Sequence, residues 1–382
     1  MSDSESMHPG DFDIVADFDP LTRSTDKCLK GVKWKATPAA YFLNNIEENL
    51  KLEEQLQNGK YRPRKPKHFK VTYPKERDIV SVAFRDRVFQ RSLNDNIIYP
   101  RISRSFIYDN MACQKGKGPD KARERLQCFL QRYYRKHGIE GYVLKCDIKG
   151  YYPNMSHKVV RDCFKKVIAG WTYQQALNVL DGQYDGETGY NPGSQMIQIA
   201  GIGILNAVDH FIKEKLHIKY YIRYMDDFIL IHHDERYLLE CKVRLAQMLG
   251  QLDCVFNSKK TNVTLLFKGI TFLGFHFRLT KTGKVIMQIN PKNVKHERKK
   301  LKKLVHLALK GERTKEKIDE CYQSWKAHAE KGNSAKLLAR MDVYYKSLWN
   351  HPEWTDDVRR DFVDKQFNQK WSNQKEVGFI DQ

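Results

Sequence analysis

Two adjacent carboxylates, Asp226 and Asp227, interrupt an otherwise apolar stretch of the sequence. The segment around them, residues 220–232, reads YYIRYMDDFILIH. Apolar and aromatic runs of this length are typical of buried strands, and the short polar break between them predicts a hairpin turn. Paired carboxylates on a buried hairpin repel each other, so they favour a bound divalent metal ion. The alternative interpretation is an ordinary exposed Asp-Asp turn.

A second predicted strand also ends in an aspartate. Residues 142–153 read YVLKCDIKGYYP, where an apolar run ends at Asp147 and turn-forming residues follow. Two such strands can pair side by side and place three carboxylates in one cleft. Oxygen ligands suit Mg²⁺, and phosphoryl transfer uses two such ions. One activates the attacking 3′ hydroxyl, and the other binds the triphosphate and the leaving pyrophosphate.

These segments resemble motifs A and C of reverse transcriptases, with Asp147 before GYYP and YMDD at 224–227. The order of motifs across about 75–290 follows the fingers, palm and thumb of that family, so the resemblance covers most of the chain. The sequence is most similar to compact bacterial reverse transcriptases of diversity-generating retroelements and to their retron-like and antiphage-defence relatives. The resemblance implies an α+β right-hand polymerase fold, with fingers, a palm built on an antiparallel sheet, and a helical thumb.

Five regions are predicted on this basis. They are a flexible acidic N-terminus (1–30), the fingers (31–140), a palm with the catalytic carboxylates (141–285), a basic helical thumb (286–350) and a C-terminal tail (351–382).

The chain carries a large excess of positive charge. Over 382 residues, 67 Lys and Arg stand against 46 Asp and Glu, a net charge of +21. This excess is typical of a protein that binds a polyanion such as nucleic acid. No stretch approaches the roughly 20 apolar residues of a membrane-spanning helix, and the N-terminus lacks the features of a signal peptide. The eight cysteines are scattered singly, as in a reduced protein, so we expect a cytoplasmic location and no membrane partner.

Several basic residues are expected, from the resemblance, to bind the incoming nucleotide. Arg77 and Arg85 would contact the template or the triphosphate. Lys115 and Lys117 flank Gln114, which stands where many relatives place a triphosphate-binding arginine. The resemblance therefore predicts a nucleotide site formed partly by this lysine pair.

Two further segments are expected, from the resemblance, to surround the nucleotide. Tyr152, five residues after Asp147, would block the ribose 2′ hydroxyl and so select deoxynucleotides; a tyrosine of the core is the alternative. Gly193 and Gln198 match motif B, the helix that packs under the template–nucleotide pair, although Ile197 replaces the serine of relatives. Both Gly193 and Gln198 are therefore candidate contacts.

The remaining motifs concern the leaving group and the primer. Lys259 or Lys260 would be the motif D general acid that protonates pyrophosphate, with Lys260 favoured and a surface lysine as the alternative. The segment GITFLGFHF resembles the motif E hairpin that grips the primer end, through Phe272, Leu273 and Gly274.

Two basic segments are expected to lie on nucleic acid. Residues 59–73 mix Lys and Arg with aromatics, which favours contact with a phosphate backbone over a merely solvated loop. The predicted helix from about residue 290 combines an apolar stripe with lysines that include Lys292, Lys295 and Lys299. It resembles a thumb helix along the template–primer duplex.

The implied reaction is RNA-directed DNA synthesis. Asp147, Asp226 and Asp227 would hold two Mg²⁺ ions, for which Mn²⁺ can substitute, while an RNA template directs addition of dNTPs to a DNA or RNA primer. A retroelement role implies a dedicated noncoding RNA and a small accessory protein as partners. The alternatives are an antiphage-defence enzyme that copies its own noncoding RNA, an RNA-synthesising polymerase, which Tyr152 opposes, and an inactive RNA-binding scaffold, which the intact carboxylates oppose.

Overall fold

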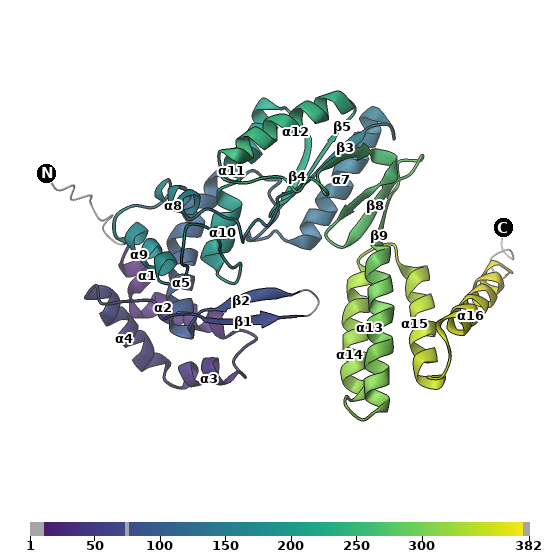
Figure 1. Cartoon of the computed structure of the whole chain (residues 1–382), viewed down its shortest axis with the longest axis horizontal. Helices are drawn as coiled ribbons and strands as arrows, with labels where there is room; N and C mark the ends of the chain where they lie inside the picture. The colour runs from purple at the N-terminus through teal and green to yellow at the C-terminus, as the bar shows by residue number, and fades with distance from the viewer. Residues whose placement is uncertain (1–10, 73–75, 377–382) are drawn as a thin grey trace. The chain divides into compact units, whose positions relative to one another are not determined.

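The computed structural model describes residues 11–72 and 76–376, and they form two compact units (Figure 1). Unit 1 comprises residues 11–126 and 141–264, and unit 2 comprises 127–140 and 265–376. The predicted fingers (31–140) and palm (141–285) lie mostly in unit 1, and residues 265–285 of the predicted palm lie in unit 2. The outermost parts of both predicted termini, 1–10 and 377–382, lie outside the described residues.

Unit 1 is mainly helical and contains a four-stranded sheet and a separate two-stranded hairpin. Its α-helices are α1 (Asp13–Ala16), α2 (Phe18–Leu29), α3 (Ala36–Leu43), α4 (Asn45–Gln57), α5 (Phe84–Leu93), α6 (Tyr99–Ile102), α8 (His157–Lys165), α9 (Gly170–Asp181), α10 (Gln195–Gly203), α11 (Asn206–His210) and α12 (Glu235–Gly250). Short π-helical turns form η1 (Asn94–Ile98) and η3 (Phe211–Lys215), and a 3₁₀ turn forms η2 (Ser103–Ser105). Helix α7 (Pro119–His137) begins in unit 1 and ends in unit 2.

The first helices correct the expectation of a flexible N-terminus. Helices α1 and α2 occupy most of residues 13–29, and Val15, Ala16 and Leu21 are fully buried. Helix α2 packs against both α4 and α5. The acidic residues that suggested disorder are spread along helices whose apolar side chains complete the core, so burial outweighs local charge.

A four-stranded sheet carries the carboxylates. Its strand order is β4-β5-β3-β6, formed by β3 (Tyr142–Asp147), β4 (Tyr220–Tyr224), β5 (Asp227–His232) and β6 (Asn262–Leu265). Strand β5 pairs antiparallel with both β3 and β4. The interiors of β4 and β5 are almost wholly buried, which explains their continuous apolar sequence. A separate hairpin, β1 (Lys67–Val71) with β2 (Arg77–Ser81), stands outside this sheet.

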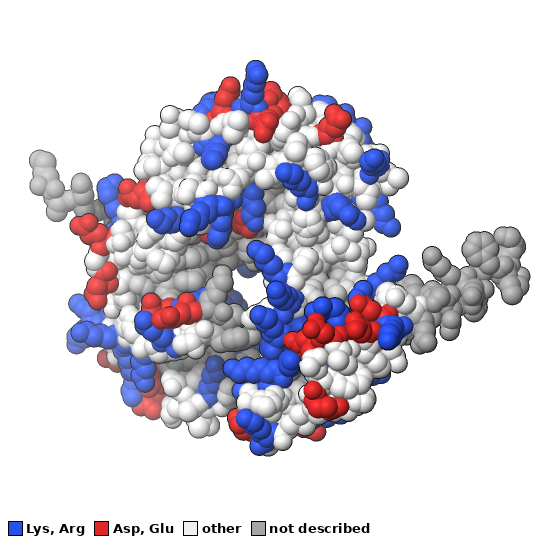
Figure 2. Space-filling view, turned by 45° about the vertical axis from the view of Figure 1, so that its right-hand side comes forward, with Lys and Arg blue, Asp and Glu red and all other residues white. Residues whose placement is uncertain are grey.

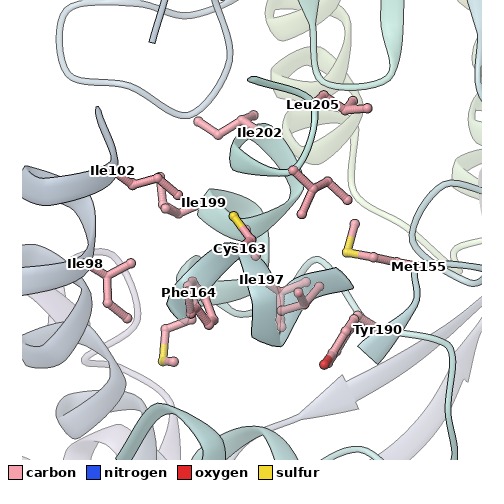
Figure 3. Close-up of a cluster of buried hydrophobic side chains, with 14 of the residues drawn as sticks. Ile98, Ile102, Met155, Cys163, Phe164, Tyr190, Ile197, Ile199, Ile202 and Leu205 are labelled. Carbon is pink, nitrogen blue, oxygen red and sulfur yellow. The ribbon is translucent and has the colours of Figure 1, made fainter. Parts of the chain in front are cut away.

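An apolar cluster in unit 1 fixes helix α10 against its neighbours. Figure 3 shows side chains of α10, such as Ile199 and Ile202, gathered with Ile102 of α6 and Cys163 of α8. Gly203 lies in this contact, where an added Cβ would be 2.5 Å from Ile102 Cδ1 and 3.0 Å from Cys163 Sγ. The helix expected to lie under the nucleotide is thus held by close packing.

Unit 2 combines a three-stranded sheet with a helical bundle. Its elements are η4 (Leu266–Lys268), β7 (Ile270–Phe272), β8 (Phe275–Leu279), β9 (Val285–Ile289), α13 (Pro291–Leu309), α14 (Lys315–Glu330), α15 (Ala335–Asn350) and α16 (Asp356–Glu376). Leu301 and Val305 of α13 pack in a core with Tyr322 and Tyr345. The last helix, α16, joins this core through Val363, so much of the tail after residue 350 belongs to the bundle.

None of the described helices combines the length and apolarity needed to cross a membrane.

Candidate active site

The β-sheet register brings the three predicted carboxylates together. Asp147 at the end of β3 lies directly opposite Asp227 at the start of β5. Asp226 occupies the tight turn that joins β4 to β5, after Met225, whose φ is 57°. Directly opposed residues of an antiparallel pair have Cβ atoms about 5 Å apart, and like charges in such positions repel each other. Two strand ends and one turn thus create a local excess of negative charge.

Burial and mutual repulsion shift the titration of two of these carboxylates. Burial raises the pKa of Asp227 to about 6, with Asp226 and Asp147 adding repulsion and Lys145 opposing the shift. Burial also raises the pKa of Asp226, and the charge of Asp147 acts in the same direction. These carboxylates are costly to ionise unless a cation lies beside them.

Two lysines supply positive charge in this structure. Lys260 Nζ lies 3.1 and 3.0 Å from the two carboxylate oxygens of Asp147. Lys145 Nζ lies 3.3 Å from Asp227 Oδ1, because Lys145 precedes Asp147 by two residues and shares its face of β3. The lysines therefore pair with one carboxylate each.

The backbone around β6 places Lys260. Asn257 N donates to the carbonyl of Asp147 at 2.8 Å, and the amide of Asp147 donates to Thr261 Oγ1 at 3.1 Å. Thr261 is fully buried, and Lys260 N donates to Asn257 O at 3.0 Å. The segment is thus anchored on both sides of Lys260, and of the two lysines left open by the sequence it is Lys260 whose ammonium meets Asp147.

The donor chemistry of the three aspartates fits a hard divalent cation, because all the ligand atoms are carboxylate oxygens that repel one another. Throughout residues 11–72 and 76–376, however, no group of three or more His, Cys, Asp or Glu side chains has the arrangement of a metal site. Asp227 and Asp147 are paired with Lys145 and Lys260 instead.

Gln198 is linked to the turn that carries Asp226, residues 225–226, by Cys113, a residue that the sequence did not reveal. Cys113, with a φ of 50°, places Sγ 3.7 Å from both Gln198 Oε1 and Met225 Sδ. The hydroxyl of Tyr152 is buried and has no hydrogen-bond partner among the described residues. An added Cβ on Gly201 of α10 would be 3.2 Å from that hydroxyl. Tyr152 therefore packs closely against α10.

The loop before α10 lies against the β1–β2 hairpin. Asn191 Nδ2 donates to Asp78 O at 2.8 Å, and Asn191 Oδ1 accepts from Gly193 N at 3.0 Å. Gly193 is exposed, as is Arg77 at the start of β2. Two expected contacts of nucleotide and template thus lie near one another through the hydrogen bonds of Asn191.

The two predicted lysines of the GKG segment differ in what they contact. Lys117 Nζ donates to the carbonyls of Tyr108 and Asn110, at 2.8 and 2.9 Å, and burial lowers its pKa. Lys115 is exposed beside Tyr99, and with Gln198 it lines a cavity of about 390 Å³. Lys115 thus remains a candidate for the triphosphate, while the ammonium of Lys117 is engaged in holding its own loop.

Arg85 is placed differently from its expected role at the template or triphosphate. Its guanidinium donates to Gln55 Oε1 and to the carbonyl of Arg62, both at 2.8 Å, and lies 3.3 Å from Asp86 Oδ1. Asp86 is fully buried and also accepts from Tyr61 OH at 3.0 Å. Arg85 therefore supports the basic segment that begins near residue 59. It donates to the carbonyl of Arg62, and its partner Asp86 accepts from Tyr61.

In unit 2, the predicted hairpin at residues 269–277 is confirmed. Strands β7 and β8 are joined by Leu273 and Gly274, whose φ values of 45° and 86° are both left-handed. Such a two-residue turn favours glycine, and its backbone twist matches the right-handed twist of the flanking strands. The side chain of Phe272 is buried, whereas Leu273 and Gly274 form the turn itself.

The predicted basic face of α13 is also present. Lys292, Lys295 and Lys299 recur at intervals of three and four residues and are all exposed, opposite the buried Leu301 and Val305. Figure 2 shows Lys and Arg side chains gathered on the helical part of unit 2. The spacing places one row of charges along one side of the helix.

Sequence reasoning missed three residues of the site. Strand periodicity could have identified Lys145, since a residue two positions before Asp147 shares its face. Cys113 and Thr261 carry no local signal, because each reaches the site from a distant part of the chain.

The family model described as reverse transcriptase (RNA-dependent DNA polymerase) matches residues 73–277. The chain belongs to this family. The matched region of this reverse transcriptase includes the three aspartates and Lys260, and its domain is that of a nucleotidyltransferase with the α+β right-hand fold.

Solved structures that resemble this reverse transcriptase include telomerases from two Candida species. Telomerase from Candida albicans, in complex with the TWJ fragment of telomeric RNA, is 14% identical with a TM-score of 0.48, covering 66% of this chain and 50% of that one. Apo telomerase from Candida tropicalis, truncated at its C-terminal domain, is 13% identical with a TM-score of 0.44, covering 64% and 60%. The chain spans about half the length of the first of these structures. Among curated proteins, none matches this sequence.

Proposed function

We propose that the protein copies an RNA template into DNA by adding deoxynucleotides to a primer 3′ end, with two bound Mg²⁺ ions and release of pyrophosphate. The observation that carries this proposal is the opposition of Asp147 and Asp227 across β3 and β5, with Asp226 in the adjoining turn. Three carboxylates at one end of the two central strands are a donor set for hard cations. The bound ions would activate the primer hydroxyl and neutralise charge on the triphosphate.

Asp147 and Asp226 are the principal ligands in this proposal. Asp227 is held by Lys145 at 3.3 Å, so its carboxylate is partly compensated within the protein. Lys260, once released from Asp147, donates a proton to the departing pyrophosphate and contributes positive charge there. Lys260 is 61% exposed, so its ammonium can leave the ion pair at small cost.

Tyr152 selects the sugar in this proposal. Its side chain packs closely against Gly201 of α10, which limits the space available beside a ribose. Gln198 and Lys115 contribute to binding the nucleotide, and Gly193 and Arg77 contact the template side. Selection by shape requires a rigid wall, and the close packing of α10 supplies one.

Template and primer are bound by residues of unit 2 as well. The turn at Leu273 and Gly274 contacts the primer end, and Lys292, Lys295 and Lys299 contact backbone phosphates. Charge of this kind binds any sequence, because phosphates carry no base information. The same reasoning assigns the basic segment 59–72 to nucleic acid.

The natural template is, in this proposal, a dedicated noncoding RNA of a bacterial or phage retroelement such as a diversity-generating retroelement. The net charge of +21 supports a stably bound RNA. Sequencing the RNA that copurifies with the protein tests this assignment. An RNA encoded beside a variable repeat agrees with it, and an RNA from a cluster of defence genes contradicts it.

Primer extension tests the activity. Purified protein is given an RNA template, a DNA primer, Mg²⁺ and either dNTPs or rNTPs, beside the Asp226→Ala/Asp227→Ala variant. We expect DNA synthesis that the variant lacks. Absence of synthesis with both a generic and a copurified RNA would refute the proposal, and incorporation of rNTPs would refute the role given to Tyr152.

A further inference from the structure

One fully buried arginine of unit 1 lies next to the turn that carries Asp226, residues 225–226. Arg223 of β4 is 0% exposed and is among the largest fully buried side chains. Its Nε and Nη2 atoms donate to the two carboxylate oxygens of Asp209, at 2.7 and 2.5 Å. Tyr221 OH donates to Asp209 Oδ1 at 2.5 Å. A two-point ion pair with a third partner is thus closed off from solvent.

The same guanidinium holds two backbone carbonyls. Nη1 donates to Met225 O at 3.0 Å, and Nη2 donates to Ile202 O at 3.0 Å. Met225 is the first residue of the turn that carries Asp226, and Ile202 lies in the last turn of α10. The guanidinium of Arg223 therefore joins the turn that carries Asp226 to α10, the helix that carries Gln198.

The backbone of Arg223 makes a further connection. Its amide donates to Asp109 O at 3.0 Å, and its carbonyl accepts from Met111 N at 2.9 Å. Asp109 is itself paired with Arg125 and Lys213. The segment that leads to Cys113 is thus fixed to the same strand position.

The fold alone gives weak reason for this pair. Burying two charges carries a large desolvation cost, and well-packed apolar residues often stabilise a core as well or better. The turn it contacts carries strain, because Met225 adopts a left-handed φ of 57° without being glycine. Such a conformation persists only where its surroundings enforce it.

We propose that Arg223, held by Asp209, is a positioning residue that fixes the turn bearing Asp226 relative to α10. The aspartate is then presented at a constant place while nucleotide and template load against Gln198 and Tyr152. This inference rests on the proposed function for its catalytic consequence, and on the hydrogen bonds above for its structural part.

The test replaces the whole buried network without leaving an unpaired charge. The variant Arg223→Met/Asp209→Leu/Tyr221→Phe removes the ion pair and the tyrosine hydroxyl together. We expect cooperative melting to be retained and kcat for primer extension to fall roughly ten- to hundredfold with little change in the KM for dNTP, since small misplacements of reacting groups cost about that much. Hydrogen exchange of peptides covering 222–227 should become faster, without metal or substrate present.

Two further variants keep the test decisive. Arg223→Lys retains a charge opposite Asp209 but cannot donate to both carbonyls, so it should lose kcat even if the triple variant fails to fold. Arg359→Met is the control: Arg359 is 1% exposed and donates to the carbonyls of Ser347 and His351 in unit 2. It should lower stability without faster exchange in 222–227.

The outcomes separate the two proposals. A kcat within twofold of the parent in Arg223→Lys, or unchanged exchange of 222–227 in both Arg223 variants, overturns the positioning role. If the parent protein makes no DNA on any template, the proposed function fails, while the exchange measurement still decides whether Arg223 holds the turn.

Discussion

Lys260 and Asp147 are separated by 113 residues, yet the ammonium of Lys260 contacts both carboxylate oxygens of Asp147. The contact joins the predicted general acid to a predicted metal ligand. It also gives the site a neutralising charge of its own, as Lys145 does for Asp227. A cation that binds Asp147 therefore competes with Lys260 for the same carboxylate.

Replacement of Lys260 should slow nucleotide addition. We expect Lys260→Gln to reduce the single-turnover rate by about 10²–10⁴-fold, because proton transfer to the pyrophosphate is lost. Lys259→Ala is the comparison, because it is Lys260 whose ammonium contacts Asp147. The single-turnover rate of the Lys259→Ala variant should stay within a few-fold of the parent rate. Equal losses in the two variants would mean that the segment contributes charge in general and no specific acid.

The effect of Mg²⁺ on stability should depend on pH. The pKa of Asp227 is raised to about 6 by burial, above the roughly 3.9 of an unfolded Asp. The folded state therefore prefers the protonated form, and stability decreases as pH rises from about 4 to about 6. Mg²⁺ binds the ionised form, so its gain in Tm should be larger at pH 7.5 than at pH 5.

Thermal melts with and without MgCl₂ at several pH values measure this effect. The Asp227→Asn variant is the control, because its amide does not titrate, and its Mg²⁺ effect should vary less over the same range. A Tm gain that is the same at pH 5 and pH 7.5 in the parent protein would contradict the prediction.

We expect the ring of Tyr152, and not its hydroxyl, to determine the preference for dNTP over rNTP. The hydroxyl is buried without a partner among the described residues, so Tyr152→Phe should preserve stability and sugar selection. Tyr152→Ala should open space and reduce the preference for dNTP over rNTP by roughly ten- to a hundredfold, which kcat/KM for each substrate measures. Undiminished selection in Tyr152→Ala would show that the tyrosine belongs to the core only.

The basic face of α13 should be visible in salt dependence. Replacing Lys292, Lys295 and Lys299 with Ala should weaken binding to a template–primer duplex and reduce the slope of log K against log salt by roughly two to three. Fluorescence anisotropy over a range of KCl concentrations gives both quantities.

The control for this prediction removes the same charge elsewhere in unit 2. Lys310, Lys315 and Lys317 are exposed at the other end of α13 and the start of α14. Their replacement with Ala should leave the slope nearly unchanged. Equal slopes for the two triple variants would argue for a diffuse charge effect.

Two glycines should respond in opposite directions to alanine. At Gly332 an added Cβ would be 2.6 Å from the carbonyl of Met287 and 3.0 Å from Phe275 Cε1, so Gly332→Ala should destabilise unit 2 by about 1–3 kcal/mol. At Gly250, the last residue of α12, nothing lies within 4 Å, and Gly250→Ala should be neutral or stabilise by up to about 1 kcal/mol. Urea unfolding of both variants measures the difference.

The sequence by itself predicted the features that depend on local pattern. Strand periodicity and turn residues placed Asp147, Asp226 and Asp227 at strand ends, and the register of β3 and β5 brings them together. The turn at Gly274 and the lysine face of α13 followed from the same kind of signal, because both depend on residues close in the chain.

Tertiary structure alone decided which partner each long side chain takes. A lysine or arginine can donate to a phosphate, a carboxylate or a backbone carbonyl, and its sequence neighbours do not distinguish these. Lys117 and Arg85 donate to backbone carbonyls, whereas Lys260 donates to the carboxylate of Asp147. The buried pair of Arg223 and Asp209 likewise depends on elements that meet only when β4 packs beside α10 and α11, since burial makes each charge require a partner.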